Sequence, residues 1–206
     1  MNQKQIKYAK VQINKQKMTK SLKRHFIEKK YTDLLDKVEL RSAELFEENS
    51  SANKFFQVHL NQILPCIAFY EVLQKELGNK DKAMQFFEDY AYDELEKYAD
   101  ILRKIMRMGM YKIAPFIFDN LVNKFFGPDA GFKSIKADGA KPFTLDMVVC
   151  PYFETCKKYG CPELTQYFCK SDDITYGNMH PRLVWGRTQT LGTGGNCCDF
   201  RLHLKE

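Results

Sequence analysis

FTLDMVV at residues 143–149, LVWGRTQTL at 183–191 and CDFRLHL at 198–204 are the stretches that decide the fold. In each of them, apolar and β-branched or aromatic residues alternate with polar ones, which is the period of a strand with one buried face. The glycine-rich link at 192–196 predicts a hairpin with a loose loop between the last two stretches. We therefore expect a small antiparallel sheet near the C-terminus.

The sequence before this sheet predicts helices, because apolar residues recur there at spacings of three and four with few β-branched runs. Gly78 is a plausible C-cap, and Pro65 is expected to kink or break the helix that contains it. We expect helices over residues 31–48, 53–78, 81–98 and 101–126, the last interrupted at Gly109 and Pro115, and a short one over 162–168.

These patterns indicate the α+β class, with an N-terminal helical layer packed on a small C-terminal antiparallel sheet that carries a cysteine-rich insertion. A chain of 206 residues can bury one sizeable core, so we expect a single domain over residues 1–206. Within it we distinguish a basic helical arm at 1–30, a helical part at 31–128, and a sheet and cysteine-rich part at 131–206.

Charge is concentrated at the N-terminus. Residues 1–30 hold ten Lys or Arg and one acid, a formal charge of +9, whereas the remainder of the chain carries −3. The lysines alternate with apolar residues in an imperfect amphipathic helix pattern, which suits a solvated helix face or contact with a polyanion. We do not expect nucleic acid as a partner, because no aromatic platform or RNA-binding motif accompanies the lysines.

No apolar stretch of signal-peptide length follows the charged start MNQKQIKYAK. The longest uncharged run, 55–70, is too polar and too short to span a bilayer. We therefore expect a cytoplasmic protein with no membrane partner. The sequence does not indicate an oligomeric state.

Six of the seven cysteines lie within residues 150–198. Thiols gathered in a reducing compartment are candidates for metal ligands, nucleophiles or redox partners. The segment contains no C-x2-C pair, so the spacing argues against a standard zinc finger. Packing is the remaining alternative, and it is the one expected for Cys66; no role is assigned to Cys156, Cys161 or Cys197.

Three strings carry a resemblance to a known family: CPYFETCKKYGCPELTQYFCKSDD at 150–173, RTQTLGTGGNCCDFRL at 187–202 and ILPCIAFYEVLQKELG at 63–78. The chain resembles the L-2-amino-thiazoline-4-carboxylic acid hydrolases from about residue 50 onward. The resemblance implies a hydrolase that acts on a small-molecule substrate, opening a cyclic amidine to a carbamoyl-cysteine through its C–N or C–S bond. The basic arm and the extra thiol at Cys197 are not part of it.

Ring opening of a 2-aminothiazoline needs attack on an amidine-like carbon, a carboxylate for the amidinium nitrogens and a proton donor for the departing sulfur. Cys169 lies three residues before Asp172 and four before Asp173, so a helical backbone would bring thiol and carboxylate to one face. With Cys198 and His180, a candidate acid or base, they form the expected reactive centre, in which Asp173 contacts the substrate.

A cation for the substrate's carboxylate is the fourth requirement, and Arg187 and Arg201 are the candidates. Arg187 lies within a predicted strand, where a salt bridge to Asp199 or Asp146 is an equal alternative. Because side chains alternate along a strand, Cys198 would share a face with Phe200, and Asp199 with Arg201.

Two mechanisms fit these residues. In one, Cys169 or Cys198 attacks as a thiolate and Asp172 orients the amidinium and shuttles the proton. In the other, Cys169 and Cys198, with a carboxylate or His180, hold a zinc ion that activates water, zinc being the one cofactor considered. The competing class is a non-catalytic module that binds a small molecule or a metal.

Overall fold

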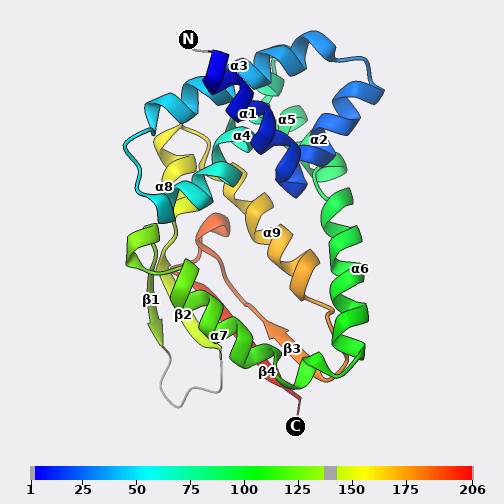
Figure 1. Ribbon diagram of the computed structural model, residues 1–206, viewed down its shortest axis with the longest axis vertical. Coiled ribbons are helices and arrows are strands. Elements are labelled where there is room, and N and C mark those ends of the chain that lie inside the picture. The colour runs from blue at the N-terminus through cyan, green and yellow to red at the C-terminus, as the bar shows by residue number, and fades with distance from the viewer. Residues whose placement is uncertain (1–2, 137–142, 206) are drawn as a thin grey trace. The chain divides into compact units, whose positions relative to one another are not determined.

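The computed structural model of the chain describes residues 3–136 and 143–205 (Figure 1). Its Cα packing groups the chain into two compact units, Met1–Glu94 and Leu95–Glu206. Unit 1 is helical, and unit 2 combines helices with an antiparallel sheet. The α+β class predicted from the sequence is confirmed, and the single domain stays a prediction.

Two helices of unit 1, those predicted over 31–48 and 53–78, begin and end close to the predicted boundaries. Asn53 caps one of them, because its side chain accepts the backbone N–H groups of Phe55 and Phe56. That helix continues through Pro65 without a break and ends at Gly78, whose φ of 59° is left-handed. The helices are α1 (Gln3–Lys15), α2 (Lys17–Glu28), α3 (Thr32–Glu48), α4 (Lys54–Leu77) and α5 (Lys80–Tyr90).

The basic arm is two helices, α1 and α2, whose apolar face lies in the core of unit 1. Ile13, Leu22 and Phe26 are completely buried. The lysines of the opposite face find acids within the same unit, where Lys10 Nζ lies 2.8 Å from a carboxylate oxygen of Glu39. The apolar half of the amphipathic pattern is therefore a packing surface.

Unit 2 holds the sheet and the cysteine-rich segment. The main elements are α6 (Asp93–Arg107, which starts in unit 1), α7 (Ala114–Phe125), β1 (Lys133–Lys136), β2 (Thr144–Val149), α8 (Pro151–Lys158), α9 (Thr165–Tyr176), β3 (Leu183–Gly186) and β4 (Cys198–Leu204). Short 3-10 turns cover Met110–Lys112, Pro128–Ala130, Pro162–Leu164 and Leu191–Thr193, the last labelled η4.

The four strands are antiparallel neighbours in the order β1-β2-β4-β3 (Figure 1). Met147 lies opposite Cys198 and Leu145 opposite Phe200, so these residues share one face of the sheet. That face is apolar and packs against α7 and α9, since Phe118 contacts Phe143, and Tyr176 contacts Trp185. The thiol of Cys198 therefore belongs to the side of the sheet that α9 covers.

Some predicted boundaries are wrong. The helix expected over 81–98 is interrupted at 91–92, where α5 ends and α6 begins. The strand expected over 183–191 ends at Gly186. The helix expected over 162–168 is a 3-10 turn followed by α9, which extends to Tyr176. β1 and α8 were not predicted, and none of the described helices is long and apolar enough to cross a membrane.

Replacing Phe26 with Ala should lower the free energy of unfolding by about 3–5 kcal/mol, because it opens a cavity in a packed core. The Phe26 ring is fully buried and meets the rings of Tyr31, Phe69 and Phe86 edge-on. Urea denaturation followed by circular dichroism measures the loss. The control is Ile27→Ala on the same helix, where the side chain is 54% exposed and the change should stay within about 0.5 kcal/mol. Equal losses in both variants would contradict the buried placement of α2.

Candidate functional site

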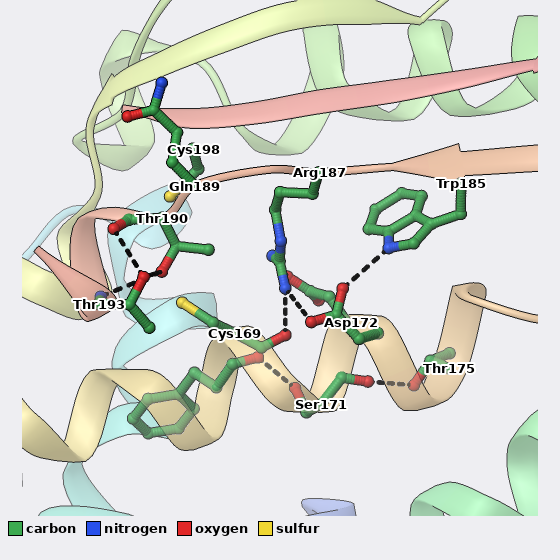
Figure 2. A network of polar contacts seen from close by, with 12 residues as sticks. Cys169, Ser171, Asp172, Thr175, Trp185, Arg187, Gln189, Thr190, Thr193 and Cys198 are labelled. Carbon is green, nitrogen blue, oxygen red and sulfur yellow. Dashed lines mark hydrogen bonds and ion pairs between the residues drawn. The ribbon is translucent and has the colours of Figure 1, made fainter. Parts of the chain in front are cut away.

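Helix α9 carries the two residues that the sequence places at the centre of the site. Cys169 and Asp172 are three residues apart, so the helix brings both to one face, and Thr165 and Tyr176 continue that face in either direction. Figure 2 shows the polar network formed between this face and the chain that follows β3. The Cys169 thiol and the Asp172 carboxyl group thus lie on one helix face, as their spacing in the sequence predicts.

Cys198, the first residue of β4, faces this helix. Its sulfur accepts a hydrogen bond from the backbone N–H of Leu191 at 3.3 Å. The next residue, Asp199, points to the other side of the strand and accepts the backbone N–H groups of Thr188 and Gln189, each at 2.9 Å. Burial alone would raise the pKa of Asp199, but these hydrogen bonds lower it.

Gly192 allows the loop to approach the helix. A Cβ atom at this residue would lie 3.1 Å from Cys169 Sγ and 3.0 Å from Thr165 Cγ2, closer than side chains normally pack. Any larger residue would push the loop away from Cys169. Because Leu191 contacts one sulfur and Gly192 the other, the two thiols are neighbours across this turn.

Cys169 is the ionised member of the thiol pair. A hydrogen bond from the Cys198 thiol lowers the pKa of Cys169 to about 6, aided by Thr190, Arg187 and the Gly192 backbone, although burial opposes the shift. The same interaction and burial raise the pKa of Cys198. Cys169 has more donors around it than Cys198 has, so we assign the negative charge to Cys169 and the proton to Cys198.

The hydroxyl of Thr190 is oriented toward Cys169 by Thr193. The Thr193 backbone N–H donates to Thr190 Oγ1 at 3.1 Å, and the two hydroxyl oxygens lie 2.9 Å apart (Figure 2). The Thr190 side chain also hydrogen-bonds the Cys169 sulfur, which lowers the pKa of that thiol. Thr190, the N-cap of the 3-10 turn η4, and Gly192 within the turn therefore supply a hydroxyl and a backbone N–H to one thiolate.

Arg187 is a buried cation, with 3% of its side chain exposed. Its guanidinium donates to the Cys169 carbonyl at 2.7 Å, to Asp173 at 2.6 Å and to Asp172 at 3.4 Å, and it lies 5.3 Å from the centre of the Phe200 ring. Burial would lower the pKa of Arg187, but the two carboxylates raise it. The partners are thus on α9 rather than at Asp199 or Asp146, and contact with a substrate anion stays a prediction.

The carboxyl groups of Asp172 and Asp173 have different environments. Desolvation raises the pKa of Asp172 to about 7, with Arg187 opposing the rise and the Cys169 charge adding to it. The Asp172 side chain is 39% exposed, so it can exchange protons with solvent. Asp173 is exposed and accepts the Trp185 indole N–H at 2.9 Å as well as the Arg187 guanidinium.

Two further groups border the site. Burial raises the pKa of Tyr176, and the Asp172 charge adds to the rise. Burial likewise raises the pKa of Cys150 to about 12, with a contribution from the charge on Cys169. Both side chains therefore stay protonated at neutral pH.

His180 and Arg201 are not brought to this cluster. His180 follows α9, stacks on Tyr111 with ring centres 3.9 Å apart and accepts the Arg182 backbone N–H. Arg201 lies on the other face of β4, where its guanidinium donates to Asp146 at 2.6 Å. Their expected roles in catalysis and anion binding stay predictions.

All seven cysteines are described, and all are free thiols. Cys156 and Cys161 are buried, and the Cys161 thiol donates to the Cys156 carbonyl. Within residues 3–136 and 143–205, no group of three or more His, Cys, Asp or Glu side chains is arranged to hold a metal ion. The donor set around Cys169 and Cys198 therefore does not fit the zinc site considered from the sequence.

Sequence reasoning missed Thr190, Gly192, Trp185 and Tyr176. Tyr176 had a signal, because it continues the helical spacing of Cys169 and Asp172 by one further turn. Gly192 belongs to the glycine cluster at 192–195, which does not match a phosphate loop, and its close approach to Cys169 explains one of those glycines. The position of Thr190 depends on the path of the chain after β3, which no local pattern sets. The contact of Trp185, within β3, with Asp173 depends on how α9 packs against the sheet.

Replacing Cys198 with Ala should raise the pKa of Cys169 from about 6 toward the ordinary thiol value, because the hydrogen bond that most favours the thiolate is lost. The pH dependence of Cys169 alkylation by iodoacetamide, followed by mass spectrometry, measures the shift. Cys197→Ala is the matched control and should leave the midpoint unchanged. A Cys198→Ala protein that keeps the wild-type midpoint would disprove the assigned hydrogen bond.

Comparison with known proteins finds a family match that includes the cysteine-rich segment. The chain matches the family model described as L-2-amino-thiazoline-4-carboxylic acid hydrolase over residues 57–202, which is more than half of its length. No curated protein and no solved structure matches the chain. All of the residues that surround Cys169 in Figure 2 lie inside the matched range. The chain therefore belongs to the L-2-amino-thiazoline-4-carboxylic acid hydrolase family.

Proposed function

We propose that this chain is a hydrolase that opens 2-amino-thiazoline-4-carboxylate, or a closely related cyclic amidine, to a carbamoyl-cysteine product, with Cys169 as nucleophile. The observation that carries the proposal is the environment of Cys169, a thiol whose pKa is lowered to about 6 beside a carboxyl group whose pKa is raised to about 7. Perturbed groups paired in this way are typical of acid–base and nucleophilic sites.

In the first step, the Cys169 thiolate adds to the amidinium carbon between the ring sulfur and nitrogen. The bond from this carbon to the ring sulfur then breaks, and protonated Asp172 gives its proton to the departing sulfur. The product is an isothiouronium group on Cys169, with the freed thiol still attached through nitrogen. Asp172 is left as a carboxylate beside this cation.

In the second step, the Asp172 carboxylate takes a proton from water as the oxygen attacks the same carbon. The bond to Cys169 breaks, the thiolate is restored and a urea group remains, which makes the product a carbamoyl-cysteine. The overall change is the addition of one water molecule, and the proton carried in by the amidinium returns to solvent. Cys198 keeps its proton throughout and stabilises the thiolate in the free enzyme.

Arg187 is assigned a positioning role in this scheme. Its guanidinium N–H groups donate to the Cys169 carbonyl and to the side chains of Asp172 and Asp173. The Trp185 indole N–H donates to the other carboxylate oxygen of Asp173. These contacts support a fixed separation between thiolate and acid, which proton transfer in step with bond breaking requires. The negative charge of the Asp173 carboxylate and the Cys169 thiolate favours a cationic amidinium ligand.

Incubating the purified chain with 2-amino-thiazoline-4-carboxylate should release carbamoyl-cysteine, detected by liquid chromatography and mass spectrometry. Cys169→Ala should lower kcat by at least about 10³-fold, because it removes the nucleophile. Cys197→Ala, the control, should keep wild-type kcat. Full turnover by Cys169→Ala would reject Cys169 as the nucleophile, and no turnover by the wild type would reject this substrate.

The pH profile of kcat/KM should be bell-shaped with its maximum between about 6 and about 7. Activity rises with pH as Cys169 loses its proton, since a lowered pKa makes the thiolate available near pH 6. It falls at higher pH as Asp172 loses the proton that the departing sulfur needs. Asp172→Asn should lower kcat by about 10²–10⁴-fold and abolish the alkaline limb. An alkaline limb that persists in Asp172→Asn would assign that ionisation to another group.

A further inference from the structure

Cys169 and Cys198 form a pair of neighbouring thiols that come from separate elements, helix α9 and strand β4 (Figure 2). The turn η4 approaches both: the Leu191 N–H donates to the Cys198 sulfur at 3.3 Å, and Gly192 lies so near the Cys169 sulfur that a Cβ added to it would come within 3.1 Å. The two thiols interact directly, with the Cys198 thiol as the hydrogen-bond donor to Cys169. The two sulfurs therefore face one turn and are neighbours there.

The two thiols differ in charge and in exposure. Cys169 is half-buried and ionised, whereas Cys198 is buried and keeps its proton. Oxidants react with thiolates far faster than with thiols, so Cys169 is the member that an oxidant meets first. The hydrolytic scheme uses Cys198 only as a hydrogen-bond donor and gives no reason for a second sulfur rather than a hydroxyl.

We propose that Cys169 and Cys198 are a reversible oxidation site, in which a hydroperoxide converts Cys169 to a sulfenic acid and Cys198 resolves it to a disulfide. The Cys169 thiolate attacks a peroxide oxygen, the O–O bond breaks, and the departing oxygen takes a proton from solvent and leaves as water or the corresponding alcohol. The Cys198 sulfur then displaces the hydroxyl group from Cys169, and this hydroxyl leaves as water with the Cys198 proton. The two thiols together supply the two electrons that reduce one hydroperoxide.

This oxidation rests on the proposed function in one respect. If Cys169 is the nucleophile, the disulfide consumes it and turnover stops until a dithiol reduces the bond. The disulfide also protects Cys169 from the sulfinic and sulfonic states, which thiols do not reverse. Cys150 is the rival resolving thiol, since it interacts electrostatically with both Cys169 and Cys198.

Titration of the reduced full-length chain with hydrogen peroxide, followed by thiol blocking and peptide mapping, tests the site. Trypsin leaves Cys161 with Cys169 in peptide 159–170 and Cys197 with Cys198 in peptide 188–201. A second cleavage by chymotrypsin after Phe168 separates the first two thiols. The Cys197→Ala background, in which Cys198 is the only thiol of its peptide, identifies the second partner.

The expected result is a Cys169–Cys198 crosslink formed by about one equivalent of peroxide, absent from Cys198→Ala and fully reversed by dithiothreitol. In Cys198→Ala, Cys169 should instead accumulate sulfinic acid. A Cys169–Cys150 crosslink, or sulfinic acid at Cys169 in the wild type while Cys198 remains free, would overturn the proposal.

Peptide mapping does not depend on turnover. A chain that forms the crosslink but does not open the thiazoline would therefore reject the hydrolytic function and leave the oxidation site standing. A chain that turns over the thiazoline but forms no Cys169–Cys198 bond would reject only the oxidation site. If the chain both opens the thiazoline and forms the crosslink, its activity should fall in proportion to the crosslinked fraction and return with dithiothreitol.

Discussion

The burial of the Arg187 guanidinium is the constraint on which the rest of unit 2's polar site depends. A cation with 3% of its side chain exposed is stable only among anions and acceptors, and it finds them all on α9, in Asp172, Asp173 and the Cys169 carbonyl. The same contacts that satisfy this charge fix the helix against the chain after β3. Arg187 also favours the Cys169 thiolate and limits the rise in the pKa of Asp172, so one side chain sets both geometry and charge.

The site is asymmetric in a way that suits two kinds of chemistry with the same sulfur. Cys169 receives donors from the Cys198 thiol, the Thr190 hydroxyl and the Gly192 backbone, and its charge in turn holds the proton on Cys198. An ionised sulfur beside a protonated carboxyl can add to an electrophilic carbon and have the leaving group protonated. An ionised sulfur beside a protonated thiol can react with peroxide and be resolved. Both reactions need the ionised sulfur of Cys169. They differ in whether the carboxyl group of Asp172 or the thiol of Cys198 acts next.

The sequence predicted the parts of this site that local periodicity determines. Helical spacing put Cys169 and Asp172 on one face, and strand alternation put Cys198 and Asp199 on opposite faces, as the structure has them. Pattern reasoning extended β3 to residue 191, whereas the strand ends at Gly186 because Asp199 binds the N–H groups of Thr188 and Gln189 that a ladder would need. Thr190 and Gly192 were missed for the same reason: their positions follow from that departure of the chain, which is a long-range contact.

The dipeptide Cys198-Asp199 serves both sides of β4 at once. The thiol reaches α9 from one face, while the carboxylate anchors residues 188 and 189 from the other. A slip of one residue in the pairing of β4 with β2, which now sets Met147 opposite Cys198, would exchange the two. It would bring a carboxylate up to the thiolate of Cys169 and leave the backbone of the loop without its acceptor. The alignment of a single strand thus decides whether a thiol or a carboxylate faces Cys169.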